Sequence, residues 1–162
     1  MKKIFLALTF ACLSSASLAE NYFGFQYGSN ELSLAGNDLS LGTVNLLYGA
    51  HFNNYVSAEV RLGVGMNGDS VRGVEVDAGP SYGAFLRVNP GEGMVSPYAM
   101  LGYTKAKAKA TSSFAEGTGV EEGLAFAFGL KFRMAEDAGL ALEFMRVSDN
   151  LIGLNLGYQL NF

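Results

Sequence analysis

The side chains that could take part in catalysis are few in this sequence and do not form a catalytic motif. Nucleophilic catalysis commonly pairs a serine or cysteine with a histidine base that an acidic group orients. His51 is the only histidine, and Phe52 and Asn53 follow it, so there is no His-x-Ser motif. The single cysteine, Cys12, lies in the apolar segment near the start of the chain. We therefore expect no catalytic residue, no cofactor and no transition-metal site, which would need several histidine or cysteine ligands.

Charged side chains offer a different chemistry, because a set of them recurs among small and polar residues at alternate positions. Four members of the set are acidic and four are basic, so their formal charges cancel. A buried charge is costly unless it is paired, and this balance predicts a network of ion pairs inside the fold. The predicted network consists of Glu59, Arg61, Glu75, Asp77, Arg87, Lys131, Arg133 and Glu143.

A second charged pattern is a row of three lysines, Lys105, Lys107 and Lys109. Alternate residues of an extended strand point to the same side, so these lysines share a face with Leu101 and Tyr103. Such a row can bind a polyanion, or it can be the solvated face of a protruding hairpin. Both interpretations stay open at this point.

The elements that must position these charges are β-strands, because the apolar residues alternate with a period of two. The last segment shows this best: the side chains from Ile152 to Phe162 at even positions are apolar, and Gly153, Asn155 and Gly157 lie between them. The same alternation marks eight segments in all: 21–29, 44–52, 56–66, 74–88, 96–110, 124–134, 140–145 and 152–162. Pro80 cannot donate to a strand ladder, so a bulge is expected beside it.

The links between these strands alternate in length. Short turns are predicted at 52–55, 89–93 and 135–138, and longer polar loops at 30–42, 67–73 and 111–120. Short turns at one end and long loops at the other are typical of bacterial outer-membrane barrels. We therefore predict an all-β fold, an eight-stranded antiparallel up-and-down transmembrane β-barrel.

The composition of the two faces distinguishes this barrel from a soluble sandwich. Only 16% of the residues are charged, 21 are glycine, and there are 12 Phe and 8 Tyr. The polar face is rich in Gly, Ala and Ser and carries isolated charges, whereas a strand face in water usually carries many charges. The apolar face is large, aromatic and almost uncharged, as lipid contact requires. We expect that face to point outward, around a narrow lumen filled by side chains.

The start of the chain has the pattern of a secretory signal peptide. Lys2 and Lys3 precede the apolar run 4–13, and Ser17-Leu18-Ala19 resembles a cleavage site. The predicted organisation is a signal peptide over residues 1–19 and a barrel domain over 20–162. The net charge of −4 argues against nucleic acid as a partner, because nucleic acid calls for a basic surface.

The C-terminal residues resemble the assembly signal of outer-membrane barrels, which ends in a strand with alternating apolar residues and a terminal Phe. Asn155, Gly157, Leu160 and Phe162 match it. In such proteins the barrel-assembly machinery reads this strand. The resemblance implies that machinery as a partner during biogenesis.

A longer stretch is similar to the OmpX/Ail group of small eight-stranded barrels. The likeness covers about residues 44–162, and these segments carry it: Gly79-Pro80-Ser81-Tyr82, 98–105, Gly129-Leu130-Lys131-Phe132, Leu142-Glu143-Phe144 and Leu156-Gly157-Tyr158. The resemblance implies a Gram-negative outer-membrane location. It says less about activity, because the loops carry no recognisable adhesive motif.

The expected function follows from the barrel and its loops. We predict a non-catalytic outer-membrane protein with a structural or surface-interaction role through its extracellular loops, and with both termini in the periplasm. A small porin-like channel, or a carrier of a small or hydrophobic ligand, is the alternative. At the expected height, Lys105, Lys107 and Lys109 would meet the phosphates of lipopolysaccharide. We expect a monomer in contact with lipid, and the loop sequences identify no extracellular partner.

Overall fold

The computed structural model describes residues 21–34, 37–71, 74–91, 93–111, 116–148 and 151–162. The predicted signal peptide over residues 1–19, with Cys12, lies outside these residues. The strands are β1 (Asn21–Leu34), β2 (Asn37–His51), β3 (Val56–Asn67), β4 (Asp69–Val71), β5 (Val74–Val88), β6 (Val95–Thr111), β7 (Glu116–Arg133), β8 (Ala138–Ser148) and β9 (Leu151–Asn161). None of the described residues forms a helix long and apolar enough to cross a membrane.

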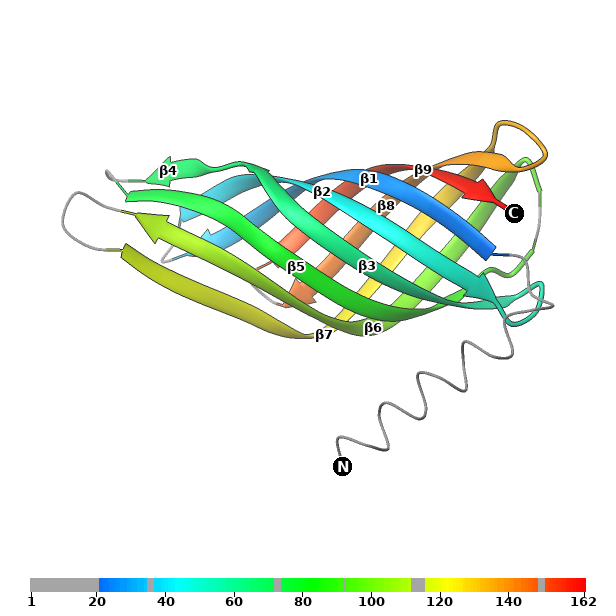
Figure 1. Ribbon diagram of the computed structural model, residues 1–162, viewed down its shortest axis with the longest axis horizontal. Coiled ribbons are helices and arrows are strands. Elements are labelled where there is room, and N and C mark those ends of the chain that lie inside the picture. The colour runs from blue at the N-terminus through cyan, green and yellow to red at the C-terminus, as the bar shows by residue number, and fades with distance from the viewer. Residues whose placement is uncertain (1–20, 35–36, 72–73, 92, 112–115, 149–150) are drawn as a thin grey trace, which may run out of the picture.

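The strands form one closed antiparallel sheet (Figure 1). Strands that follow each other in the chain pair, except that β3 and β4 both pair with β5 and not with each other, so these two act as one interrupted strand. The barrel closes between β1 and β9, where Asn21 N–H donates to the Phe162 carbonyl at 2.9 Å and Phe162 N–H donates to the Asn21 carbonyl at 2.8 Å. The predicted eight-stranded antiparallel barrel is thereby confirmed.

The two ends of the barrel differ. The turn after β2, the links from β5 to β6 and from β7 to β8, and residues Asn21 and Phe162 gather at one end, which we call the short-turn end (Figure 1). The β1–β2 and β6–β7 hairpins project at the opposite end, the long-hairpin end, together with β4. The barrel is thus asymmetric along its axis, with compact links at one end and extended hairpins at the other.

The side chains of the strands alternate between a lipid-like exterior and a filled interior. Large apolar side chains are exposed around the middle of the barrel; Phe25 is 53% exposed and Leu62 65%. Further members of this apolar band are Phe23, Leu46, Val60, Leu86, Leu101, Phe126, Phe128, Leu142, Leu154 and Leu156. Polar and charged side chains such as Gln26, Glu59 and Asn155 are fully buried. This is the reverse of a soluble protein, and it matches an apolar surface that meets lipid.

The bulge expected at Pro80 is present, but its consequence for the upstream half of β5 differs from the prediction. Pairing with β6 shifts between Ala78 and Ser81, so one extra residue sits on β5. Because side chains alternate with a period of two, this shift reverses the faces on its far side. Glu75 and Asp77 are therefore exposed, and Val76 between them is buried. The prediction that Glu75 and Asp77 line the lumen is wrong for this reason.

The longer loops predicted at 30–42, 67–73 and 111–120 are largely strand. β1 and β2 pair as far as Leu34 and Asn37, and β6 and β7 pair as far as Thr111 and Glu116. The alternation continues there with smaller or isolated apolar residues, which fill the inside of the long-hairpin end. This apolar cluster contains Leu32, Leu39, Leu41 and Val76, with Val74, Ala78, Ala108, Ala110 and Leu151 against it.

Candidate functional site

A network of buried charges crosses the lumen between opposite walls. We call it the central network, and its charged members are Glu59 and Arg61 on β3, Arg87 on β5 and Glu143 on β8. All four are nearly inaccessible; Glu143 is fully buried and Arg61 is 5% exposed. Two carboxylates and two guanidinium groups balance one another. The folded interior thus holds these charges without an excess of either sign.

Arg61 is the centre of this network. Its Nη1 and Nη2 donate to Glu143 Oε1 and Oε2 at 2.6 and 2.7 Å, a bidentate pair that reaches across the lumen. Its Nε donates to Glu59 Oε1 at 2.5 Å. The guanidinium also lies 4.9 Å above the Phe85 ring. A planar guanidinium fits this fork-to-fork geometry, which a lysine could not reproduce.

Arg87 fills the layer next to Arg61, toward the short-turn end. Its guanidinium carbon stacks 3.7 Å from the Tyr98 ring centroid, and its Nη1 lies 3.6 Å from Glu59 Oε2. Its Nε donates to Asn89 Oδ1 at 3.0 Å, and Nη1 donates to Gln159 Oε1 at 3.4 Å. Arg87 is therefore held by a charge, an aromatic face and two amide oxygens.

Neutral donors complete the coordination of the two carboxylates. Tyr22 Oη donates to Glu59 Oε2 at 2.7 Å, and Tyr98 Oη donates to Glu143 Oε2 at 3.0 Å. Asn155 Nδ2 donates to Glu143 Oε1 at 3.2 Å. Buried ion pairs are tolerated when their remaining hydrogen-bonding capacity is satisfied in this way. The arrangement has the character of a plug that ties opposite walls together.

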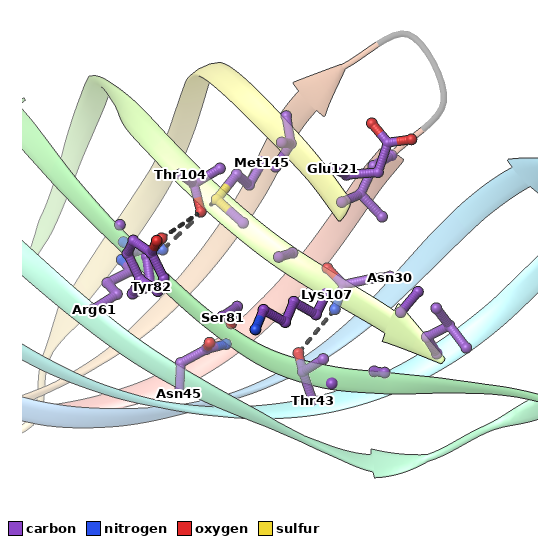
Figure 2. Close-up of a pocket in the computed structure, with 18 of the residues that line it drawn as sticks. Asn30, Thr43, Asn45, Arg61, Ser81, Tyr82, Thr104, Lys107, Glu121 and Met145 are labelled. Carbon is purple, nitrogen blue, oxygen red and sulfur yellow. Dashed lines mark hydrogen bonds between the residues drawn. The ribbon is translucent and has the colours of Figure 1, made fainter. Parts of the chain in front are cut away.

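The central network separates two cavities. The cavity on the long-hairpin side measures about 80 Å³ and is lined mainly by small and apolar side chains, with Asn30, Asn45 and Thr43 on one wall (Figure 2). Arg61 forms its floor, and Asn30 Nδ2 donates to Thr43 Oγ1 at 2.8 Å beside it. The cavity at the short-turn end measures about 180 Å³ and is lined mainly by polar and charged side chains. We call these the outer cavity and the polar cavity.

The polar cavity holds two residues that the sequence predicted for the charge network. Lys131 is partly buried and its Nζ donates to Asn161 Oδ1 at 3.3 Å, and Arg133 is exposed at the end of β7. Both line the polar cavity, on the short-turn side of the central network. Of the eight predicted residues, the structure therefore brings Glu59, Arg61, Arg87 and Glu143 together and places Lys131 and Arg133 beside them. Glu75 and Asp77 lie on the outer wall.

His51 lies at the end of β2 and lines the polar cavity too. Its ring is tilted by 50° against that of Tyr22, with 5.2 Å between the ring centroids. In the described part of the chain, no three His, Cys, Asp or Glu side chains are grouped closely enough to hold a metal ion. The interior charges that the structure describes form ion pairs and hydrogen bonds.

The lysine row lies on the outer wall, beyond the apolar band and toward the long-hairpin end. Lys105 stands opposite Glu122 on β7 and forms an ion pair with it. Lys107 and Lys109 are more exposed and stand opposite Val120 and Thr118, and Lys107 also borders the outer cavity. The structure thus keeps the three lysines on one face, where Lys105 pairs with Glu122 and Lys109 stands opposite Asp77 on β5.

The four residues of the C-terminal pattern divide between the two faces of β9. Leu160 and Phe162 point outward and are exposed. Asn155 and Gly157 point inward, where Asn155 contacts Glu143 and Gly157 leaves room for Gln26. A Cβ on Gly157 would lie 2.5 Å from Gln26 Cγ. Packing inside the barrel therefore accounts for the residue types at Asn155 and Gly157.

Sequence reasoning missed the neutral members of the central network. Tyr22 and Tyr98 are both buried and each donates to a carboxylate. Aromatic residues dominate the outer face, so nothing in their type marked these two as interior. The available signal was their parity: Tyr98 is two residues from Met100 and alternates with the outward Leu101 and Tyr103.

Comparisons with known proteins agree with this architecture. A family model described as "Outer membrane protein beta-barrel domain" matches residues 4–162. Among proteins with curated descriptions, none matches the chain. Similar solved structures include Ail, the attachment invasion locus protein of Yersinia pestis, in complex with the heparin analogue sucrose octasulfate. It is 22% identical, with a TM-score of 0.65, and the alignment covers 89% of this chain and 99% of that one.

Two further structures show the same likeness. Neisserial surface protein A is 13% identical with a TM-score of 0.63, over 88% of this chain and 97% of that one. The N-terminal β-barrel domain of Pseudomonas aeruginosa OprF is 16% identical with a TM-score of 0.58, over 89% of this chain and 99% of that one. At these identities the likeness to solved structures concerns the fold.

Proposed function

Because this chain belongs to the outer membrane protein beta-barrel domain family, we propose that it is a structural or surface-interaction protein of the outer membrane, without catalytic activity. In this proposal the short-turn end, with both ends of the barrel domain, faces the periplasm. The long-hairpin end then faces the outside of the cell. The residues 1–19 would serve as the signal peptide that sends the chain across the inner membrane.

The observation that carries this proposal is the closed central network. Arg61 and Glu143 join opposite walls at 2.6 and 2.7 Å, and the ring of Tyr98 packs against Arg87 in the next layer. An ion that passed this point would have to break charged hydrogen bonds between buried side chains, which is costly. The surface that remains for interactions is the outer wall and the projecting hairpins.

The partner that fits the outer wall best is a polyanion at the membrane surface. Lys107 and Lys109 are exposed above the apolar band, at the height where lipopolysaccharide phosphates would lie in the proposed orientation. Lys105 adds its ammonium group, although Glu122 shares it. The structurally similar Ail protein is described in complex with the heparin analogue sucrose octasulfate, itself a polyanion. We propose that the lysine row anchors the protein to lipopolysaccharide.

The test replaces Lys105, Lys107 and Lys109 together with glutamate and measures lipopolysaccharide binding of the refolded protein. The expected result is loss of lipopolysaccharide co-purification and of the rise in melting temperature that lipopolysaccharide causes in the wild-type protein. Binding to the wild type should weaken as salt is added, because exposed charges are screened.

Arg133→Glu is the control, because it changes a charge at the opposite end of the same protein. It should bind lipopolysaccharide as the wild type does. If the triple variant binds equally well, the lysine row is only a solvated face of the β6–β7 hairpin. Assembly in cells is tested separately: removal of Phe162 should reduce the amount of folded protein in the outer membrane if the assembly machinery reads the last strand.

A further inference from the structure

The polar cavity at the short-turn end has the features of a binding site, and it lies apart from the lysine row. Its walls come from the ends of β1, β2, β5, β6, β7 and β9, and its mouth from the short turns, where Asn54, Gly91 and Glu136 lie. We propose that this cavity binds a phosphate group. The volume of about 180 Å³ would hold a phosphate with a few waters, since one water takes roughly 30 Å³.

The charges around the cavity favour an anion. Arg87, Lys131 and Arg133 line it, and Glu136 is the one acidic side chain among the lining residues that the structure describes. Glu59 forms an ion pair with Arg87, but it lies in the central network and is also paired with Arg61. The lining therefore carries an excess of positive charge, which matches a phosphate monoester with its charge of about −1.5 to −2 at neutral pH.

A buried amide nitrogen points to the same ligand. Gln159 is 1% exposed and lines the cavity. Its Oε1 accepts from Arg87 Nη1, and its Nε2 makes no hydrogen bond to any residue that the structure describes. A buried donor without an acceptor is costly. The nitrogen itself is inaccessible, and a small rotation of the Gln159 side chain would present this donor to an oxygen of an oxyanion in the cavity.

The side chains around Gln159 are held in place before any ligand arrives. Arg87 is fixed by Asn89 and by the Tyr98 ring, and Lys131 Nζ is held by Asn161 Oδ1. A rigid set of donors loses little entropy on binding, which favours affinity. Arginine and lysine donors on rigid strands are also the groups that bind phosphate oxygens most strongly.

The phosphate could come from two sources, free phosphate or the headgroup of a phospholipid at the short-turn end, and the experiment separates them. The refolded protein in a phosphate-free nonionic detergent is titrated with inorganic phosphate by calorimetry. In a second arm, protein in nanodiscs with or without phosphatidic acid is titrated with the same phosphate. Saturable binding in detergent supports the site, and competition by phosphatidic acid identifies the headgroup as an occupant.

Gln159→Glu is the decisive variant, because it keeps the size of the side chain and the acceptor for Arg87 but replaces the buried donor by a carboxylate. We expect phosphate affinity to fall by about ten-fold or more, as for loss of a hydrogen bond to a charged group. The double variant Lys131→Gln with Arg133→Gln should show a similar loss. Arg146→Gln, which removes a charge on β8 away from the polar cavity, should bind as the wild type does.

Folding of each variant is checked by the shift of the folded barrel on an unheated gel, so that a loss of binding is not a loss of structure. The proposal is overturned if the wild-type protein shows no saturable heat with phosphate in detergent and none that phosphatidic acid competes for. It is equally overturned if folded Gln159→Glu binds phosphate as tightly as the wild type. Neither result depends on lipopolysaccharide binding, so the proposed function is tested independently.

Discussion

Arg61 and Glu143 stand on opposite walls of the barrel and are joined through its interior by two hydrogen bonds of 2.6 and 2.7 Å. From β3 to β8 the sheet crosses three strands in either direction: β2, β1 and β9 one way, and β5, β6 and β7 the other. The pair therefore spans a diameter of the barrel. Few single interactions could link more distant parts of this wall.

Replacement of Arg61 by Met should destabilise the barrel strongly. The change leaves Glu59 and Glu143 buried without the guanidinium that both contact. Loss of one partner from a buried ion pair costs about 3–5 kcal/mol. Urea unfolding in lipid vesicles measures this loss, and Arg133→Met at the exposed end of β7 is the control. A similar free energy of unfolding for Arg61→Met and the wild type would show that the network contributes little.

Removal of both ends of the diametric pair should open a path for ions. The wild-type protein is expected to show no stable conductance steps in planar bilayers, and the double variant Arg61→Ala with Glu143→Ala should show them. The reason is that the two large side chains that join opposite walls leave the lumen. The matched control is Lys105→Ala with Glu122→Ala, which removes an ion pair from the outer wall. Stable steps in the wild type would favour the porin-like alternative over a plugged barrel.

Addition of one methyl group at Gly49 should be costly, because Tyr22 occupies the space. A Cβ there would overlap the Tyr22 ring at Cζ, and the Tyr22 hydroxyl is already committed to Glu59. Overpacking of this kind costs about 1–3 kcal/mol. Gly117→Ala on β7 is the control, since nothing lies within 4 Å of the position that its methyl group would take. Equal unfolding free energies for the two variants would argue against a tightly packed interior around Tyr22.

Protonation of Asp69 at acid pH should loosen the structure of the long-hairpin end. Backbone N–H groups of Ser40 and Ser70 donate to its carboxylate, and these hydrogen bonds hold the pKa of Asp69 below its usual value. The stabilisation is present above the usual pKa of about 3.9 and is lost as the pH falls through the lowered value. The protection of the Ser40 amide against solvent exchange, taken relative to the intrinsic exchange rate at each pH, should fall over that range.

Asp69→Asn is the control for this pH effect. An amide oxygen still accepts a hydrogen bond but does not titrate, so the protection of the Ser40 amide should show no acid transition. If the wild type and Asp69→Asn show the same acid transition, another group is responsible for it.

Cysteine labelling tests both the bulge in β5 and the proposed orientation. In a Cys12→Ser background, Asp77→Cys should react with a membrane-impermeant maleimide on intact cells, because Asp77 is exposed near the long-hairpin end. Val76→Cys, one residue away but buried, should react far less. Asn54→Cys in the short turn should react only after permeabilisation. Labelling of Asn54→Cys on intact cells would reverse the orientation.

The fold was largely predictable from the sequence, because a period of two is a strong signal and the faces differ so clearly in composition. The alternation around Leu62 and Leu156 placed both strands correctly, and Pro80 marked the irregularity in β5. Whether the residues before Pro80 would exchange faces was not predictable, because a strand with a one-residue bulge and an unbroken strand have the same composition. Only the pairing of Ala78 and Ser81 with β6 shows that Glu75 and Asp77 change sides.

The central network was predictable in type but only partly in membership. Glu59, Arg61 and Glu143 were found because charges between apolar residues are conspicuous. Which charges meet depends on the stagger between strands, and Lys131 and Arg133 lie too close to the short-turn end to reach Glu143 in the same layer. Neutral donors such as Tyr22 have no charge that would mark them in the sequence. Their role is recognised only from the hydrogen-bond distances in the structure.

The seam between β1 and β9 has a kinetic consequence. All the other neighbours in the barrel are joined by hairpins, whereas Asn21 and Phe162 meet only after the entire wall between them has curved round. Loop-closure entropy rises by about 0.6 kcal/mol for each doubling of the closed length, and contacts between distant residues slow folding. Closing of this seam is thus the step at which the sheet loses its last two open edges, and until then both edges can pair with another strand.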